Sequence, residues 1–257
     1  MNIIDSPVLT VLVAVAACAV DLDGIAPKPD GKHPASESAQ PGKDSSGLRP
    51  DKSSGKALTL AELPGRYQFL LSEAMIRFQV RDFKTALDYV DRADEILPPT
   101  ACSLNVRGAI AVEQRDFERG YKFFTEALKL DPDFLPAKFN ICEIPFLQGK
   151  YADARRLWTP LLSLTKMGDA SWELLIYRIY LTYLLEKDFD HAKEWLDKIP
   201  FPSLSPAYQY AHAAWAYQKG DIAKWDEWTR SAAFIWPEST RGEFMDVLIQ
   251  LGWMKRE

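Results

Sequence analysis

From about residue 58 to the end of the chain, apolar residues recur at three- and four-residue intervals, as at Phe83, Leu87, Val90 and Leu97. This spacing puts them on one face of an α-helix, because a helix turns once every 3.6 residues. We find no sustained apolar–polar alternation bounded by turn residues, the pattern typical of a half-buried strand. The pattern predicts an all-α fold for residues 58–257.

Two segments before residue 58 lack this helical pattern. Residues 7–20 (PVLTVLVAVAACAV) are an apolar run, and residues 21–57 are rich in Pro, Gly, Ser, Asp and Lys. The apolar run has the length of a signal-peptide core and falls short of the ~20 residues that span a bilayer. The polar segment has too little apolar surface to offset its chain entropy, so we predict a disordered linker. We therefore divide the chain into a signal-like segment (1–20), a linker (21–57) and a folded domain (58–257).

The apolar run ends in the tetrapeptide VAAC, whose last residue is Cys18. This resembles a bacterial lipobox and implies that Cys18 becomes the lipidated first residue of an exported chain. The residues before the run contain no Lys or Arg and include Asp5, which departs from a secretory signal. Two alternatives stay open: a cytoplasmic chain with an apolar N-terminus, and an oligomerisation helix formed by residues 7–20.

Three segments of the folded region, which begin at Asp82, Asp116 and Lys150, align without gaps. Each has a small residue four positions after its start, and a second set of small residues lies twelve positions before the first: Ala86, Gly120 and Ala154 in one set, Ala74, Gly108 and Cys142 in the other. Within each set the members are 34 residues apart. Two weaker copies follow, with Ala192 and Trp225 at the first small position, and the fourth copy carries a four-residue insertion.

The 34-residue period resembles the tetratricopeptide repeat. The resemblance covers about residues 67–237 and is clearest in the second repeat, where Gly108, Ala127 and Pro132 are in register. It implies a right-handed α-solenoid of about five helix hairpins. A C-terminal helix beginning at a Thr240–Glu243 capping box would close the last repeat.

In this family the first helix of each hairpin lines a concave groove that binds other proteins or peptides. The resemblance therefore implies eight candidate groove residues: Asn105, Phe139, Glu143, Phe146, Tyr177, Arg178, Tyr210 and Tyr217. Several of their aromatic rings are equally suited to packing between helices. The family's clamp for a terminal carboxylate is matched only at Asn105, so we do not expect that mode of binding.

Composition limits the function further. The net charge is −5, which argues against a nucleic-acid binder because such proteins carry basic surfaces. The cysteines Cys18, Cys102 and Cys142 have neither zinc-site nor disulfide-framework spacing, and we expect the last two to be small buried apolar residues. No histidine lies in a catalytic motif. We expect a protein-interaction scaffold without catalytic residues, metal or cofactor, in the cell envelope and attached to a membrane only through Cys18.

Overall fold

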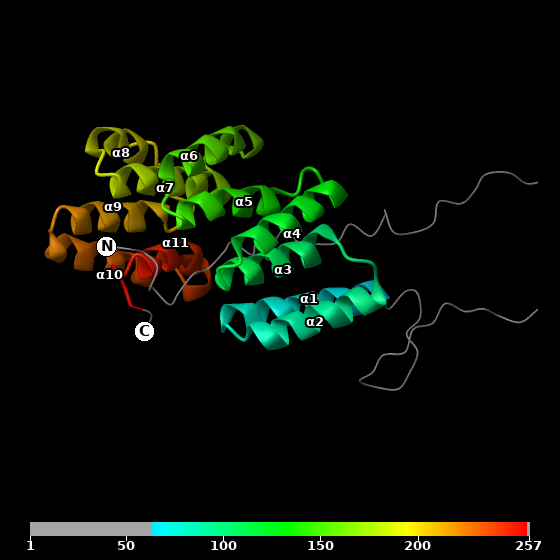
Figure 1. The fold of residues 1–257 in the computed structure, drawn as a ribbon. Helices are drawn as coiled ribbons and strands as arrows, with labels where there is room; N and C mark the ends of the chain where they lie inside the picture. Colours follow the sequence, from blue (N-terminus) through cyan, green and yellow to red (C-terminus); the bar gives the residue numbers. More distant parts are fainter. Residues whose placement is uncertain (1–62, 256–257) are drawn as a thin grey trace, which may run out of the picture.

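A computed structural model describes residues 63–255, and the signal-like segment, the whole linker and residues 58–62 of the folded domain lie outside this range. The described residues form eleven α-helices and a 3₁₀ helix, with no strand among them. The all-α fold expected from the sequence is confirmed for this part of the chain (Figure 1). The helices are α1 (Leu63–Gln79), α2 (Phe83–Ile96), α3 (Ala101–Glu113), α4 (Phe117–Leu130), α5 (Leu135–Leu147), α6 (Tyr151–Trp158), η4 (Thr159–Leu164), α7 (Ala170–Leu185), α8 (Phe189–Leu196), α9 (Ala207–Gln218), α10 (Ile222–Ile235) and α11 (Glu238–Gln250).

Neighbouring helices pack in pairs. Helix α1 packs against α2, α3 against α4, α5 against α6, α7 against α8, and α9 against α10. Each pair also contacts the next one along the chain, and α11 packs against α9 and α10. In Figure 1 the pairs follow one another from α1–α2 to α9–α10, with α11 beside the last pair. The core is therefore one continuous apolar layer shared by successive pairs.

The two helices of every pair are joined by the same turn. One residue of each turn has a left-handed backbone: Arg81 (φ 62°), Arg115 (64°), Gly149 (74°), Lys187 (61°) and Gly220 (74°). The next residue donates its backbone N–H to the carbonyl five residues earlier, over 2.8–3.0 Å, as in a Schellman motif. Positions 81, 115, 149, 187 and 220 are 34, 34, 38 and 33 residues apart. The turn therefore recurs at nearly the same interval as the small residues.

The residue that follows this left-handed position caps the second helix of the pair. In four pairs it is an aspartate, whose Oδ1 accepts the backbone N–H three residues on over 3.1–3.3 Å: Asp82, Asp116, Asp188 and Asp221. These caps satisfy a backbone donor that the helix itself leaves open. In the third pair the position is Lys150, which makes no side-chain cap hydrogen bond. The second helix of the third pair, α6, therefore lacks the side-chain N-cap hydrogen bond that the other four second helices have.

Helices α3 and α4 approach each other closely at two glycines. A Cβ placed on Gly108 would lie 2.4 Å from a ring carbon of Phe124, and one on Gly120 would lie 2.5 Å from a methyl carbon of Val112. Real Cβ atoms essentially never approach so closely. The remaining small positions of the repeat are buried: Ala74, Ala86, Ala127, Ala154 and Ala192 fully, and Cys142 almost fully.

Two prolines alter the third pair. Pro145 lies inside α5, close to its end. The α-helical part of the second helix ends at Trp158, and the chain continues as the 3₁₀ helix η4 with Pro160 at its second position. Proline has no N–H to donate and clashes with the preceding turn, which accounts for the end of the α-helical hydrogen bonding.

The last helix begins earlier than the sequence suggested. Its N-cap is Pro237, without a side-chain cap, and its first residue is Glu238. Thr240 lies within the first turn, so the predicted capping box is wrong, because proline already sets the helical φ just ahead of it. The helix packs with Phe244 and Leu248 buried.

Candidate functional site

The eight candidate groove residues lie on the first helices of their pairs, but mostly inside the protein. Seven are buried, and Tyr217 is half-buried. The seven are Asn105, Phe139, Glu143, Phe146, Tyr177, Arg178 and Tyr210. The structure therefore places them along an internal seam that runs from α3 through α5 and α7 to α9, and we call these eight residues the seam.

The aromatic members of the seam fill space between helices. The rings of Phe139 and Phe146 lie 5.8 and 5.5 Å from the Trp158 ring of α6. Such tilted ring pairs are typical of packed cores. Tyr217 is different, because its ring lies 4.9 Å from that of Trp253 near the chain end and retains exposed surface. It is the seam residue most open to a partner.

The polar members of the seam bridge successive first helices. Asn140 of α5 donates through Nδ2 to Oδ1 of Asn105 of α3 at 2.9 Å. One turn further along α5, Glu143 forms an ion pair with Arg178 of α7, with Oε1 and Nε 2.9 Å apart but not aligned as a hydrogen bond. Both charged side chains are almost fully buried. A buried pair of this kind is sensitive to the loss of either partner, because the remaining charge is then unpaired in the protein interior.

The seam also holds the last helix in place. The Tyr177 hydroxyl donates to the backbone carbonyl of Phe244 at 3.1 Å, and the two rings lie 5.5 Å apart. Arg178 donates to the backbone carbonyl of Glu243 at 3.3 Å. Helix α11 therefore covers two seam residues of α7 that sequence reasoning assigned to a partner. The sequence separation of more than 60 residues gave no local signal for this contact.

Burial changes the acidity of the carboxyls around Arg178. It raises the pKa of Glu143, and the neighbouring Arg178 guanidinium opposes that rise. Burial likewise raises the pKa of Glu243 to about 7, with Arg178 again opposing and the Asp246 carboxylate adding to the rise. The Arg178 guanidinium thus acts on two carboxyl groups at the junction of α5, α7 and α11, those of Glu143 and Glu243, and the Asp246 carboxylate acts on the second of them.

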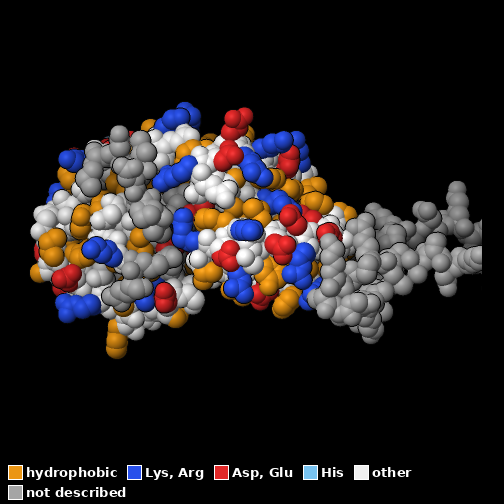
Figure 2. Space-filling model, turned by 60° about the horizontal axis from the view of Figure 1, so that its bottom comes forward, with side chains coloured by type: hydrophobic (Ala, Val, Ile, Leu, Met, Phe, Trp, Pro, Cys, Tyr) orange, Lys and Arg blue, Asp and Glu red, His pale blue; other side chains and the backbone are white. Residues whose placement is uncertain are grey.

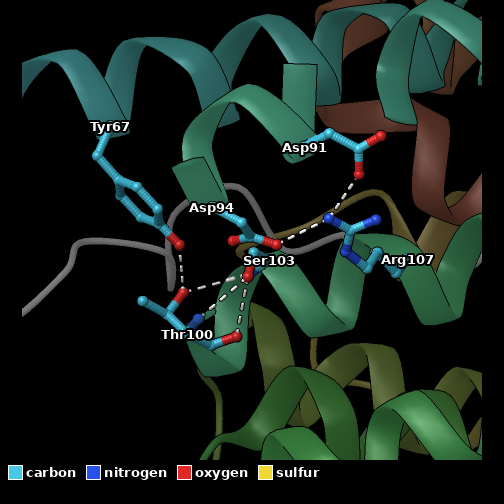
Figure 3. A network of polar contacts seen from close by, with 6 residues as sticks. All are labelled: Tyr67, Asp91, Asp94, Thr100, Ser103 and Arg107. Atoms are coloured by element: carbon cyan, nitrogen blue, oxygen red, sulfur yellow. Dashed lines mark hydrogen bonds and ion pairs between the residues drawn. The ribbon is translucent and has the colours of Figure 1, made fainter. Parts of the chain in front are cut away.

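A second polar network joins α1, α2 and α3 (Figure 3). The Tyr67 hydroxyl lies 2.8 Å from Oγ1 of Thr100, which forms a capping box with Ser103 at the start of α3. One turn further on, Arg107 lies 2.8 Å from carboxylate oxygens of both Asp91 and Asp94 of α2. The signal for the capping box, Thr followed by Ser three residues later, was present in the sequence but went unused.

Cys102 and Cys142 differ in chemistry. Cys142 is a free, buried thiol, as expected from the sequence, and burial raises its pKa far above the usual range. Cys102 is also buried, but it is disulfide-bonded. The expectation that Cys102 is an unmodified apolar residue was therefore wrong, because sequence spacing does not report which cysteines meet in space. Cys18 lies outside the described residues.

The exposed surface carries apolar residues among charges of both signs. On the face drawn in Figure 2, blue and red side chains are interspersed with orange ones. Helix α1 exposes Phe69 and Ile76, which share one face at a spacing of seven, and Val80 is exposed in the turn directly after this helix. Phe234, near the end of α10, is 92% exposed. Exposed apolar residues in such groups are typical of interaction surfaces.

Among residues 63–255, no three His, Cys, Asp or Glu side chains are grouped so as to hold a metal ion. No helix of this same part of the chain is long and apolar enough to cross a bilayer.

No protein-family model matches the chain, and no curated protein sequence matches it significantly. The likeness to tetratricopeptide repeats is therefore carried by the residues and the turns of this chain alone.

Proposed function

We propose that this chain is a protein-interaction scaffold built from tetratricopeptide-type helix hairpins. In this proposal the five helix pairs form a right-handed α-solenoid, and α11 covers its last pair. The observation that carries the proposal is the recurrence of one left-handed turn in all five pairs, at intervals of 33–38 residues. Repeated helix pairs of this period stack into extended surfaces that bind proteins or peptides. The proposal assigns the chain no reaction, cofactor or nucleic-acid ligand.

The burial of the seam changes where the partner would make contact. The buried seam residues would support the first-helix surface through packing. The partner would contact those first-helix residues whose side chains are exposed. These are the exposed Phe69 and Ile76 of α1 and the half-buried Tyr217 of α9. A few residues, most often Trp, Tyr or Arg, supply most of the binding free energy in protein interfaces, and Tyr217 is of this type.

Site-specific photocrosslinking in the native host tests this proposal. A photoreactive phenylalanine analogue replaces Phe69, Ile76 or Tyr217, with the exposed second-helix residues Tyr121 and Leu130 of α4 as matched controls. We expect discrete crosslinked protein bands from the first-helix positions and none from α4. Bands only from α4 would place binding on the opposite face, and an absence of bands from all five positions would contradict a scaffold.

For location, we propose that the chain is exported to the cell envelope. The lipobox-like segment ending at Cys18 supports export. The competing hypothesis is a cytoplasmic adaptor or co-chaperone whose apolar N-terminus has no export role.

Membrane fractionation and intact-mass measurement of the natively expressed chain, beside a Cys18→Ala variant, separate these hypotheses. A chain that starts at Cys18, carries acyl mass and sediments with membranes is a lipid-anchored envelope protein. A chain found in the periplasm without acyl mass is exported but not lipidated. A full-length chain confined to the cytoplasm contradicts export and leaves the helical scaffold unaffected.

A further inference from the structure

Helix α11 contacts a helix that is not its neighbour in the stack of pairs. In a stack of repeated helix pairs, each unit normally touches only the units next to it. Helix α11 packs against α9 and α10, as expected of the next element along the chain. It also reaches back to α7 of the preceding pair, where Tyr177 donates to the carbonyl of Phe244 and Arg178 donates to the carbonyl of Glu243. Helix α11 therefore lies across the first helices of the last two pairs.

The segment that contains α11 interacts with every seam residue of these two pairs. The two on α7 bind the carbonyl groups just described. Tyr210 of α9 interacts with Arg241 of α11, whose charge opposes the rise that burial causes in the pKa of the tyrosine hydroxyl. Tyr217, near the end of α9, stacks on Trp253 with the ring planes 21° apart. The seam of the last two pairs is thus already occupied by a helix of this chain.

The turn after α11 sets the position of Trp253. Gly252 has a left-handed backbone (φ 70°), and the Trp253 N–H donates to the carbonyl of Leu248, five residues earlier, at 2.9 Å. The first helices of all five pairs end in the same turn. The side chains of Phe244, Val247 and Leu248, at spacings of three and four residues, are all buried. The occupant of the seam is therefore an amphipathic helix that ends as a first helix does.

Several features of α11 favour its release from this surface. Residues 238–240 are exposed, and the N-cap Pro237 makes no side-chain cap hydrogen bond. The carbonyls that bind α7 belong to the interior of the helix, where each also accepts a backbone N–H, so release leaves no acceptor unsatisfied. Burial, opposed by the neighbouring guanidinium, raises the pKa of Glu243 to about 7, and release lets this carboxyl ionise freely. The apolar contacts of Phe244 are then the main interaction that a competing helix must replace.

We propose that this surface of α7 and α9 is a binding site for an amphipathic helix of a partner protein, and that α11 occupies the site in the free chain. The partner helix would place a bulky apolar residue against Tyr177, as Phe244 does, with apolar residues three and four positions further on. Its binding would displace α11, because both helices need the same donors on α7. This inference rests on the proposed scaffold function, for which it names the class of partner.

A dye-labelled peptide of residues 238–253 serves as a probe helix for the full chain. We expect the parent chain to bind it weakly, because its own α11 fills the site. Phe244→Ala in the chain removes the ring that lies 5.5 Å from that of Tyr177. It should raise the apparent affinity for the peptide by about tenfold or more, since that affinity scales with the fraction of open sites.

Two controls accompany this titration. Thr240→Ala, at an exposed position of the same helix, should leave the affinity of the chain for the peptide unchanged. A peptide that itself carries Phe244→Ala should bind neither the parent chain nor the variant. A photoreactive residue at position 244 of the unmodified peptide should crosslink to α7.

Hydrogen exchange on the unmodified chain gives a measurement that depends on no variant. The amides of α11 should exchange through local opening, faster than those of α7, and excess peptide should speed their exchange further. Three results would overturn the inference: no peptide binding to the Phe244→Ala chain, exchange of α11 only when the whole domain unfolds, or a dimer in which α11 of each copy fills the site of the other. If any of these occurs while photocrosslinks from Phe69 and Ile76 persist, the scaffold function stands without this site.

Discussion

The close contact between α3 and α4 predicts opposite effects for the same substitution at two helical glycines. Replacing glycine by alanine inside a helix normally raises stability by about 0.5–1 kcal/mol, because alanine loses less backbone entropy on folding. Gly242 in α11 should follow this rule, since an added Cβ there meets no atom closer than 4.0 Å. Gly242→Ala is therefore the matched control.

Gly108→Ala should instead lower the free energy of unfolding. The added Cβ would lie 2.4, 2.6 and 3.0 Å from three carbons of the Phe124 ring, and Phe124 is fully buried, so the ring has no free space to move into. Overpacking in such a site costs about 1–3 kcal/mol, which exceeds the gain in helix propensity. We expect Gly108→Ala to be about 1–3 kcal/mol less stable than Gly242→Ala.

Urea denaturation followed by circular dichroism, with both variants and the parent chain in one buffer, measures this difference. Adding Phe124→Leu to Gly108→Ala should recover part of the loss, because the smaller side chain makes room for the methyl group. If Gly108→Ala is as stabilising as Gly242→Ala, the two helices are further apart than described and the close approach at Gly108 is wrong.

Three further predictions concern charges and caps, all measured as unfolding free energies. Arg178→Met should lose about 3–5 kcal/mol at neutral pH because it leaves the Glu143 carboxyl buried without its partner, and adding Glu143→Leu should restore most of that loss; an additive double variant would contradict the pairing. Asp116→Ala should lower the free energy of unfolding by about 1 kcal/mol through the missing cap, and Lys150→Asp should raise it by about 0.5–1 kcal/mol by supplying one. If both substitutions change stability in the same direction, the two positions do not share one capping role. Burial raises the pKa of Glu243 to about 7, so between about pH 4.5 and 7 the folded chain binds more protons than the unfolded chain. The free energy of unfolding should therefore fall as the pH rises through this interval. Glu243→Gln should flatten this slope, and an unchanged slope would refute the assignment.

The features predicted best from the sequence are those set by local repetition. The 34-residue spacing located the small residues at which helices approach closely, as Gly108 and Gly120 illustrate. The left-handed turn repeats at the same interval but was missed. Three of its five positions are Arg81, Arg115 and Lys187. Arg and Lys rarely adopt positive φ, so the sequence contained no signal for a left-handed residue at these positions.

The environment of the candidate site was harder to predict. Sequence position assigned Tyr177 and Arg178 to a groove, but α11 folds back and covers both. This contact joins residues more than 60 positions apart, and no periodic pattern encodes it. The identity of the disulfide-bonded cysteine was equally hidden, because pairing depends on which side chains meet in the folded chain.

The regular turns have a mechanical consequence. Within each pair the chain reverses through a short turn whose left-handed residue has a φ of 61–74°, so we expect the two helices to move as one block. The connections between pairs differ more, from four residues (97–100 and 131–134) to ten (197–206). The α7–α8 block lies between the two longest of them, the other being 165–169. Arg178 is held to α5 on one side and to α11 on the other, and we expect these contacts to restrict rotation of the block relative to its neighbours.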